Sequence, residues 1–536
     1  MSEIKAFVNG KIFTSDDSNP YAEAMIVEDG LIRWIGKKDE IPYTDLPVTV
    51  IDLQAKRVLP GFVDAHMHVG MLAEQSLQIS CLPPAVSSID DLVASIKSVR
   101  SRQKAGDWIT GWGYDEGKIA DNRLPDRHDL DAACSDAPVC IIRTCEHIRC
   151  VNSRALQMAG IDRDTPDPQG GMIERDEDGE PTGILRENAR NLVSEIMPEL
   201  TDDEMTACLV RTGKLLASQG ITAVTDMGSL EGKDHYNCLL RAAADGFRQQ
   251  TAVYYIWDYF KDDPEFVIDA DRSRSDAQIR IAGLKLIGDG SVSGRTAWMD
   301  EPYKGSNDEY GMPVYSDDLM DSAIEFCRKT RCQLSVHAMG ARAIKRAVDR
   351  LCEEIPWTYE GIPFARVEHI TEPLEESIAK AAHSGIMFVT QPDFLYAEIE
   401  SYIKNLGMER LCKAYPVKHM LDRGVKLAFS TDAPATAWSE PSDPMPCLKF
   451  AATRKSYDGT DCGADEAVDI ETAVKLYTRC SAEAAGFSKT GQLKAGYRAD
   501  FIVFDKDIFE MDPDDLDKVS VQQTYIKGEC VYEKII

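Results

Sequence analysis

Short apolar, β-branched runs recur through the middle of the chain and alternate with stretches of helical periodicity. In the helical stretches, apolar residues lie three and four positions apart, as in a helix that packs one face against a sheet. This alternation predicts β–α–β units and a parallel sheet, and about eight such units favour an α/β fold of the closed (β/α)8 TIM type over an open sheet. The strand runs are 139–142, 221–224, 280–287, 333–336, 366–369, 386–390 and 426–430, and the helical stretches include 203–218, 319–330 and 341–355.

Both ends of the chain have a different pattern, with short β-prone runs separated by turn residues. We therefore expect residues 1–57 and 485–536 to meet in one small β-sandwich domain and residues 58–484 to form the barrel. Residues 71–200 are too long for a single β–α unit and contain many turn residues, so we expect an insertion after the first barrel strand, near the active-site mouth. The terminal strands are expected at 5–8, 24–28, 31–35 and 500–505 and on both sides of Lys527-Gly528.

Composition narrows the class of partner. The net charge of −30 repels polyanions, so we expect a small-molecule substrate and neither nucleic acid nor an anionic membrane surface as partner. The 15 cysteines are odd in number and form no CxxC motif, which favours buried thiols in a reducing compartment. We find no signal-peptide pattern and no apolar run long enough to cross a bilayer, and expect a cytoplasmic protein. A homodimer is left open.

The strongest local signal is a pair of histidines one residue apart at the end of an apolar run, in Leu59-Pro-Gly-Phe-Val-Asp-Ala-His66-Met-His68. Residues i and i+2 of a strand share a face, so both imidazoles can converge on one cation. The carboxyl ends of barrel strands are where active sites lie. The alternative is two unrelated histidines at a strand end, but the Pro-Gly and the apolar strand before them favour a ligand pair.

Three further residues end apolar runs in the same way. His337 closes the run that begins at Cys332, and His369 closes the run that begins at Ala365. Each alone is more often a structural histidine, but the chain has only nine histidines, and four at strand ends are hard to obtain by accident. Asp432 follows the run where the last barrel strand should fall; it is either the N-cap of the next helix or a metal ligand that accepts a proton from water.

Lys285 lies inside an apolar run, where a charged amine is costly to bury. One interpretation is a side chain that extends its ammonium group to solvent. The other is a neutral amine that reacts with CO2 to give a carbamate, an oxygen ligand able to bridge two cations. Burial and a nearby metal ion both favour the uncharged amine.

The order HxH, Lys, His, His, Asp resembles the amidohydrolase superfamily, specifically the YtcJ-like branch that includes N-substituted formamide deformylases. The resemblance covers nearly the whole chain and is specific for the family rather than for a substrate. The family segment around the lysine usually runs Lys-Leu-Phe-Ala-Asp-Gly; here Ile287 and Gly288 replace the middle pair, which affects local packing and not the ligand positions. Further similar segments are 111–116, 149–156, 183–187, 289–291, 295–297, 366–369 and 491–503.

The resemblance implies a role for each ligand position. His66 and His68 would hold a first cation with Asp432, His337 and His369 would hold a second, and carboxylated Lys285 would bridge both. Two divalent ions are expected, Zn best, with Fe, Mn or Co compatible. In the mechanism that we expect, hydroxide formed between the cations attacks a carbonyl, and Asp432 passes the water proton to the leaving nitrogen. The reaction would hydrolyse a C–N bond of an amide or N-substituted formamide, with Asp432 and Lys285 as the catalytic residues.

Six more residues are weaker candidates for contact with the substrate. Each has an alternative role in a turn, a cap or packing. Three of them follow the Lys285 strand and three lie in the expected insertion. They are Asp289, Arg295 and Trp298, and Tyr114, His147 and Glu187.

Two other functions compete with amide hydrolysis. A hydrolytic deaminase on the same barrel would attack an amidine carbon with one metal. Such deaminases tend to carry a glutamate close after the fifth-strand histidine; Gly340 stands there, although Glu368 keeps this alternative open. A non-catalytic barrel protein would be marked by lost ligands, and all six are present. A fold alone does not imply a function, so the ligands weigh more than the barrel.

Overall fold

The structure is a computed structural model of the whole chain, and it divides into two compact units that are described separately. The first unit consists of Met1–Gly70, Leu209–Thr436 and Ser442–Ile536. The second consists of Met71–Cys208 and Ala437–Pro441. The residues that the structure describes are 4–42, 47–104, 106–144, 148–230, 232–359 and 361–535.

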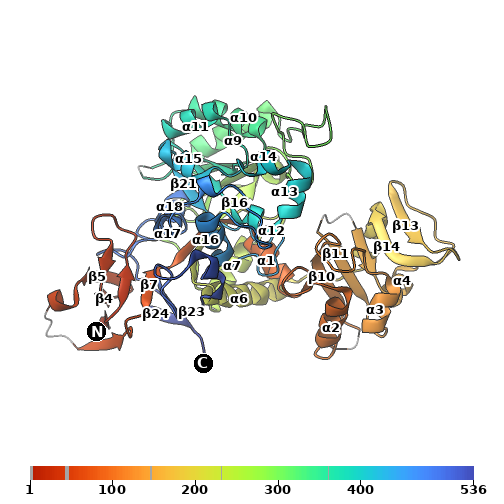
Figure 1. Cartoon of the computed structure of the whole chain (residues 1–536), viewed down its shortest axis with the longest axis horizontal. Coiled ribbons are helices and arrows are strands. Elements are labelled where there is room, and N and C mark those ends of the chain that lie inside the picture. The colour runs from red at the N-terminus through yellow and green to blue at the C-terminus, as the bar shows by residue number, and fades with distance from the viewer. Residues whose placement is uncertain are drawn as a thin grey trace. The chain divides into compact units, whose positions relative to one another are not determined.

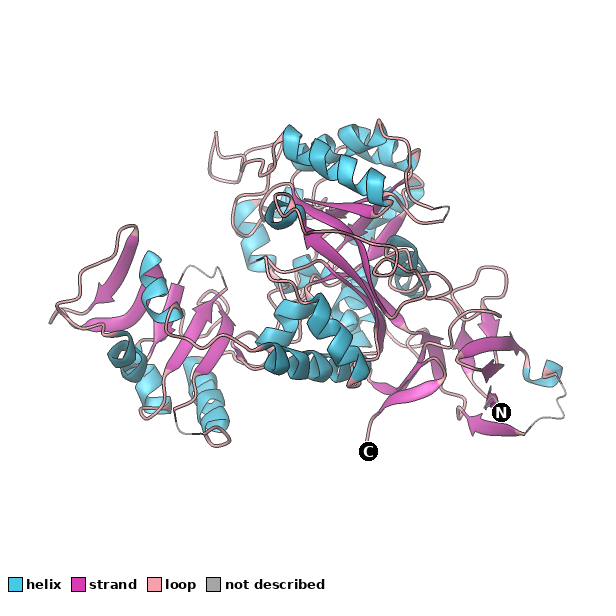
Figure 2. Ribbon diagram, turned by 180° about the vertical axis from the view of Figure 1, so that it is seen from behind, coloured by secondary structure: helices cyan, strands magenta, loops and turns pink. Residues whose placement is uncertain are grey.

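Eight parallel strands of the first unit form a nearly closed barrel, which confirms the predicted TIM-type fold (Figures 1 and 2). Their order is β8-β15-β16-β17-β18-β19-β20-β21, so every neighbour in the sheet is also the next barrel strand along the chain. The strands are buried almost throughout, as expected for a parallel sheet that is covered on both faces. Their bounds are β8 Phe62–Met67, β15 Ile221–Asp226, β16 Gln250–Ile256, β17 Ile279–Ile287, β18 Gln333–Ala338, β19 Ala365–His369, β20 Ile386–Thr390 and β21 Leu427–Phe429.

The first and last strands of this sheet meet at its carboxyl end. The backbone N–H of Asp432 donates to the carbonyl of His66 at 2.8 Å, and that of His68 donates to the carbonyl of Ala433 at 2.7 Å. These bonds close the barrel at its mouth. They also bring the HxH motif against the segment that carries Asp432.

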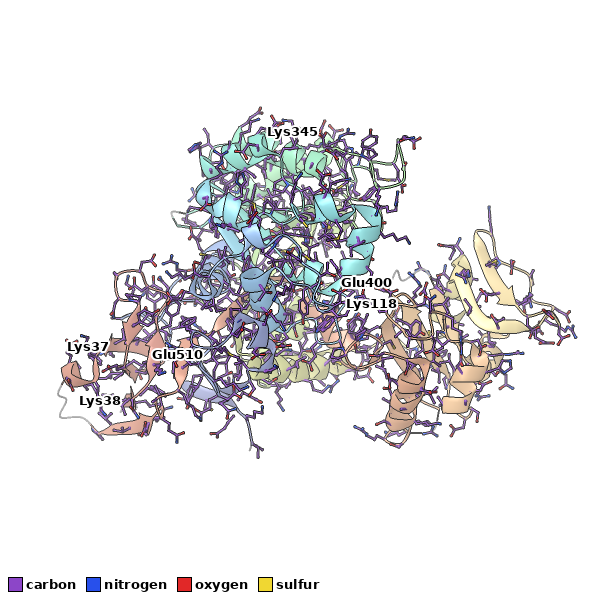
Figure 3. The ribbon with its side chains drawn as sticks, in the orientation of Figure 1. Lys37, Lys38, Lys118, Lys345, Glu400 and Glu510 are labelled. Atoms are coloured by element: carbon purple, nitrogen blue, oxygen red, sulfur yellow. The ribbon has the colours of Figure 1, made fainter. Side chains whose placement is uncertain are left out.

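Helices cover the outside of the barrel, and some of them begin at a side-chain cap. In α9, the Ser316 side chain accepts the N–H of Leu319. Helices α10 and α11 are joined at the surface by Lys345, whose Nζ lies 2.8 Å from Asp349 and 3.0 Å from Glu376 (Figure 3). No helix of the described residues combines the length and the apolar character needed to cross a bilayer. The helices of this unit include the part of α6 Asp202–Ser218 from Leu209 onward, α7 Tyr236–Ala244, α8 Trp257–Phe260, α9 Asp317–Thr330, α10 Ala341–Cys352, α11 Glu375–Ala382, α12 Asp393–Ala397, α13 Ile399–Asn405, α14 Met408–Leu411, α15 Val417–Asp422, α16 Pro444–Thr453, α17 Ile470–Leu476 and α18 Arg479–Ala484.

Two strands differ from the sequence-based assignment. The run at 139–142 is not a barrel strand, because it lies in β11 of the second unit. The barrel strand β16 was missed, since it begins with polar Gln250 and Thr251. Gln250 is nevertheless buried, and its Oε1 accepts a hydrogen bond from Thr490 at 3.1 Å.

The two ends of the chain build a β sandwich in the first unit. One sheet has the order β5-β4-β1-β6, and the other, β24-β23-β22-β7-β2-β3, combines strands from both ends. Phe7, Phe501 and Tyr525 pack in the shared core. The strands are β1 Ile4–Val8, β2 Lys11–Phe13, β3 Tyr21–Ala22, β4 Ala24–Glu28, β5 Leu31–Gly36, β6 Val48–Asp52, β7 Arg57–Pro60, β22 Phe501–Phe504, β23 Val521–Ile526 and β24 Glu529–Glu533.

The second unit contains most of the chain between β8 and β15 and has a sheet of its own, with the order β13-β14-β12-β11-β10-β9. Helix α3 begins with a capping box, in which the side chain of Asp126 accepts the backbone N–H of Asp129 and the side chain of Asp129 accepts the backbone N–H of Asp126. Two apolar clusters pack against this sheet. The elements are β9 Ile79–Ser80, α2 Ile89–Arg100, β10 Ile109–Tyr114, α3 Arg127–Ala133, β11 Val139–Arg143, β12 Ile148–Val151, α4 Ser153–Ala159, β13 Gly171–Arg175, β14 Pro181–Glu187 and α5 Asn191–Ser194.

Candidate metal centre

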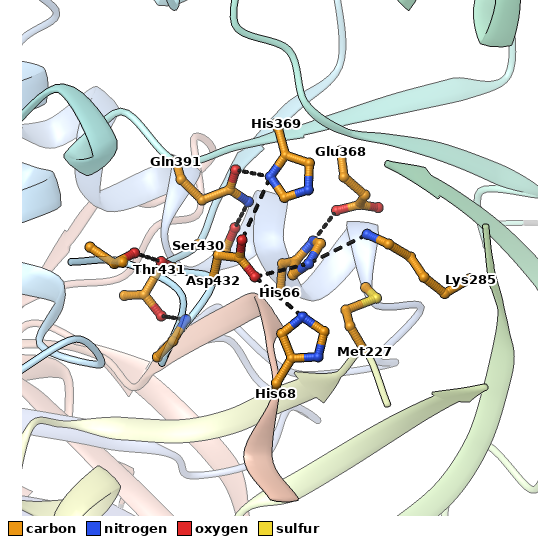
Figure 4. A network of polar contacts seen from close by, with 12 residues as sticks. His66, His68, Met227, Lys285, Glu368, His369, Gln391, Ser430, Thr431 and Asp432 are labelled. Atoms are coloured by element: carbon orange, nitrogen blue, oxygen red, sulfur yellow. Dashed lines mark hydrogen bonds and ion pairs between the residues drawn. The ribbon is translucent and has the colours of Figure 1, made fainter. Parts of the chain in front are cut away.

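Six polar side chains gather at the carboxyl end of the barrel, each from the end of a different strand or from the HxH pair, and all except His337 are labelled in Figure 4. In a parallel barrel all carboxyl ends lie at one rim, so residues far apart in sequence become neighbours. The six are buried almost completely, apart from a partly exposed His337. They are His66 from β8, His68 directly after β8, Lys285 from β17, His337 from β18, His369 from β19 and Asp432 after β21.

His66, His68 and Asp432, called here the HxH cluster, form the tightest part of this group. Their potential ligand atoms all lie within 4.8 Å of one another. Oδ1 of Asp432 is 3.3 Å from Nε2 of His66 and 3.5 Å from Nε2 of His68. Three ligand atoms at these separations can share one cation of the size of Zn²⁺.

His337 and His369, called here the two-histidine pair, lie beside this cluster. Their ring centroids are 4.3 Å apart, and Nδ1 of His369 is 3.8 Å from Oδ2 of Asp432. The Lys285 amine reaches the same place, with Nζ 3.5 Å from Nε2 of His66 (Figure 4). All six predicted positions are therefore brought together.

Three of the histidines are oriented by an oxygen acceptor beside Nδ1. Nδ1 of His66 lies 2.6 Å from a Glu368 carboxylate oxygen, and Nδ1 of His68 lies 2.6 Å from the carbonyl of Gly228. Nδ1 of His369 lies 2.9 Å from Oε1 of Gln391. Because these oxygens accept hydrogen bonds, each Nδ1 carries the hydrogen and each Nε2 keeps a lone pair, as in histidines that bind metals.

His337 is held in the opposite way. Its Nε2 lies 3.1 Å from the carbonyl of Gly290 and 3.3 Å from Oδ1 of Asp289. Asp289 is fixed in turn, since it accepts the backbone N–H groups of Met339, Gly340 and Trp298 at 2.8–3.0 Å. This arrangement puts the hydrogen of His337 on Nε2 and leaves Nδ1 with the lone pair.

Two atoms of the centre are buried without a hydrogen-bond partner: Oδ1 of Asp432 and Nε2 of His369. A buried polar atom without a protein partner costs free energy, and a bound ion is a common partner for such an atom in a native protein. Nitrogen and carboxylate ligands of this kind suit Zn²⁺. The donor set therefore fits a divalent cation.

Charges inside the barrel set the protonation of the centre. Burial lowers the pKa of the Lys285 amine from 10.5 to about 8. Burial raises the pKa of Asp432, but the nearby His66 and His68 outweigh it and hold that pKa well below the usual value of 3.8. Burial and the adjacent His337 keep the pKa of His369 well below 6.5. Asp432 is therefore ionised and His369 neutral at neutral pH, which are the forms that bind cations.

Glu368 and Gln391 are partners of the ligands that were not predicted from the sequence. Glu368 is fully buried, and its carboxylate binds Arg366 at 2.5 Å and 3.0 Å, as well as Ser335 and His66. Burial raises its pKa, but Arg366 and His66 hold the pKa well below 4.5. Gln391 directly follows β20, so its position at a strand end was the one signal that could have found it.

The six weaker candidates lie in varied places and remain predictions as substrate contacts. Asp289 contacts His337 and is 1% exposed, so its oxygens serve the centre's own residues. Arg295 pairs with Glu309 at 2.6 Å, and Trp298 is half-buried. In the second unit, Tyr114 is fully buried and its hydroxyl donates to the carbonyl of Arg123 at 2.9 Å, Glu187 is exposed at the end of β14, and His147 is outside the described residues.

Comparison with known proteins identifies the family of this chain. Residues 49–532 match the model of the amidohydrolase family. The chain belongs to the amidohydrolase family. The YtcJ protein of Bacillus subtilis is 30% identical over 545 residues, and the N-substituted formamide deformylase of Arthrobacter pascens is 28% identical over 549 residues; each alignment covers 98% of both chains. A solved metal-dependent hydrolase from Pyrococcus horikoshii superposes with a TM-score of 0.74 at 25% identity, over 95% of this chain and 99% of that one. The family and these relatives support a metal-dependent hydrolase.

Proposed function

We propose that this member of the amidohydrolase family hydrolyses a C–N bond of a small amide or N-substituted formamide. The reaction would use two divalent cations, and Zn²⁺ is the ion that we expect first. The HxH cluster would hold one cation and the two-histidine pair the other. The observation that carries the proposal is a single centre that brings together four histidines, whose partners each leave one ring nitrogen with a lone pair, and a buried carboxylate oxygen of Asp432 without a partner.

Lys285 supplies the remaining ligand in this proposal. With a pKa of about 8, about one amine in ten is neutral at pH 7, and this fraction can attack CO2. The new N–C bond gives a carbamate, and the amine loses one proton to solvent. The added carboxylate would extend from Nζ, which already lies 3.5 Å from Nε2 of His66 in the HxH cluster.

The protein's own residues account for the proton transfer. When bound, the cations would polarise the substrate carbonyl and acidify water at the centre. The Asp432 carboxylate is ionised, and its Oδ1 has no hydrogen-bond partner, so it can take the proton of the attacking water. The same oxygen then delivers that proton to the leaving nitrogen as the C–N bond breaks.

Deamination is less well supported. That alternative depended on Glu368 as a proton shuttle to the substrate. Both of its oxygens are occupied, one by Ser335 and Arg366 and the other by His66 and Arg366. Glu368 therefore orients a ligand and has no free oxygen for the substrate. The similarity to an N-substituted formamide deformylase supports an amide-type substrate for this chain instead.

The experiment combines metal analysis with a substrate panel. The purified chain is assayed for bound metal and for hydrolysis of N-substituted formamides and acyl amides, with ammonia release from nucleobases as the deaminase test. Asp432→Asn should lower kcat/KM by about a thousandfold or more, because it removes the proton acceptor. The matched control is Asp276→Asn, an exposed aspartate paired with Arg274, which should leave kcat/KM unchanged. A metal-free wild type, or an Asp432→Asn variant as active as the control, would refute the proposal.

A further inference from the structure

The turn that follows the ligand His369 has an unusual backbone. His369 has a φ of +76° and Ile370 a φ of +56°, so two consecutive residues other than glycine lie in the left-handed region. This region is sparsely populated by L-residues and is least favourable for a β-branched residue such as isoleucine. Such a conformation persists only where the surroundings enforce it. Because the backbone of His369 sets the direction of its imidazole, the contacts that enforce the turn also aim the ligand.

The next residue, Thr371, fastens this turn to a distant segment of the chain. Its N–H donates to the carbonyl of Met339 at 3.2 Å, and its own carbonyl accepts the N–H of Tyr415 at 2.8 Å. Its hydroxyl donates to the hydroxyl of Tyr415 at 3.0 Å. Thr371 and Tyr415 are both fully buried. Two of the three bonds that fix Thr371 therefore come from one tyrosine.

Tyr415 is itself held firmly. Its hydroxyl lies 2.6 Å from that of Tyr402 on α13, and its carbonyl accepts Nη1 of Arg454 at 3.1 Å. Tyr402 and Arg454 are each 1% exposed. Since water has no access to these groups, it cannot replace a bond that is lost here. The chain of contacts from Arg454 through Tyr415 and Thr371 thus ends at the turn of His369.

We propose that Tyr415 is a positioning residue for His369: its hydroxyl, through Thr371, keeps the left-handed turn that directs Nε2 of His369 to the centre. The inference rests on the proposed function in one respect, namely that His369 holds a cation. It adds a residue separated from His369 by 46 positions that touches neither the cation site nor the substrate in this account.

The test is Tyr415→Phe, which removes the hydroxyl and leaves the ring and the backbone bond in place. Outer partners of metal-binding histidines typically change metal affinity by about 10- to 100-fold, so we expect about a tenfold loss for one of two bound ions. Affinity is measured by chelator competition with Zn²⁺ and with Co²⁺, and the visible spectrum of the Co²⁺-loaded protein should change. Tyr255→Phe is the matched control, since Tyr255 is also buried and its hydroxyl donates to Asp234 at 2.9 Å and not to the turn that follows His369.

Two variants of Thr371 distinguish the loss of this hydrogen bond from a folding defect in Tyr415→Phe. Thr371→Val removes the other hydroxyl of the same bond and should weaken the same ion, whereas Thr371→Ser keeps the hydroxyl and should retain the wild-type affinity. Affinities and Co²⁺ spectra equal to wild type in both Tyr415→Phe and Thr371→Val would overturn this inference alone. A wild-type chain that binds no metal would refute the proposed function and leave Tyr415 nothing to position.

Discussion

The HxH cluster and the two-histidine pair lie side by side, but different contacts hold them. Backbone hydrogen bonds between the ends of β8 and β21 fix the cluster, because Asp432 N binds His66 O and His68 N binds Ala433 O. The pair depends on side-chain partners, because Asp289 holds His337 and Gln391 holds His369, whereas a positive φ occurs in both groups, at His369 and at Asp432. The closure of the barrel builds the first group, whereas tertiary contacts build the second. We therefore expect the cluster to bind its cation more tightly than the pair.

The largest expected changes in turnover and metal content come from replacing one histidine in each group. His337→Asn should abolish measurable turnover and leave one bound ion per chain, since the cluster keeps its own ligands. His68→Asn should also abolish turnover, and it should weaken the tighter of the two ions. Metal content and stepwise chelator titration of both variants measure this. If His337→Asn lost both ions at the same chelator concentration as His68→Asn, the two groups would not differ.

Lys285 lies beside His66 of the HxH cluster, and its burial should cost stability. In the metal-free protein its pKa falls from 10.5 unfolded to about 8 folded. At pH 7 both states bind the proton, so the shift corresponds to a penalty on the order of 3 kcal/mol. Between pH 8 and pH 10.5 the unfolded state binds more protons, and the free energy of unfolding should rise with pH by the same amount.

The variant that tests this penalty is Lys285→Met, which replaces the amine by an uncharged side chain of similar length. At pH 7 the metal-free variant should be more stable than wild type by on the order of 3 kcal/mol, and the difference should vanish above pH 10.5. Its activity should be lost. Urea unfolding at several pH values measures the difference. Equal stability of the two proteins at pH 7 would show that the Lys285 ammonium is not buried in this way.

The smallest effect is expected from Gln391→Met, which removes the acceptor of the His369 Nδ1 hydrogen. The imidazole would lose its preferred tautomer, and the weaker ion should dissociate about tenfold more readily. The tighter ion should be unaffected. Gln523→Met, on the exposed face of β23 next to Glu533, is the control and should leave both affinities unchanged. Equal loss of both ions in Gln391→Met would remove the distinction between the groups.

Only part of the fold and of the centre could be predicted from the sequence. The HxH motif, Asp432 and the strand-end histidines were predictable, because the carboxyl ends of parallel strands share one rim. Glu368 as a partner of His66 was not, since the two residues are 302 positions apart and meet only in the closed barrel. Strand β16 was missed because its first residues are polar, and only tertiary packing shows that Gln250 is buried and bonded. The positive φ of His369 has no signal in residue type, because the turn contains no glycine.

The most direct test of the account is X-ray diffraction from crystals grown with Zn²⁺, recorded on both sides of the zinc absorption edge. We predict two anomalous peaks per chain, one between the His66, His68 and Asp432 side chains and one beside the His337 and His369 rings. Density for a carboxylate on Nζ of Lys285 should join them. No peak at the barrel mouth, or a Lys285 ammonium that turns away from the histidines, would contradict the two-cation centre.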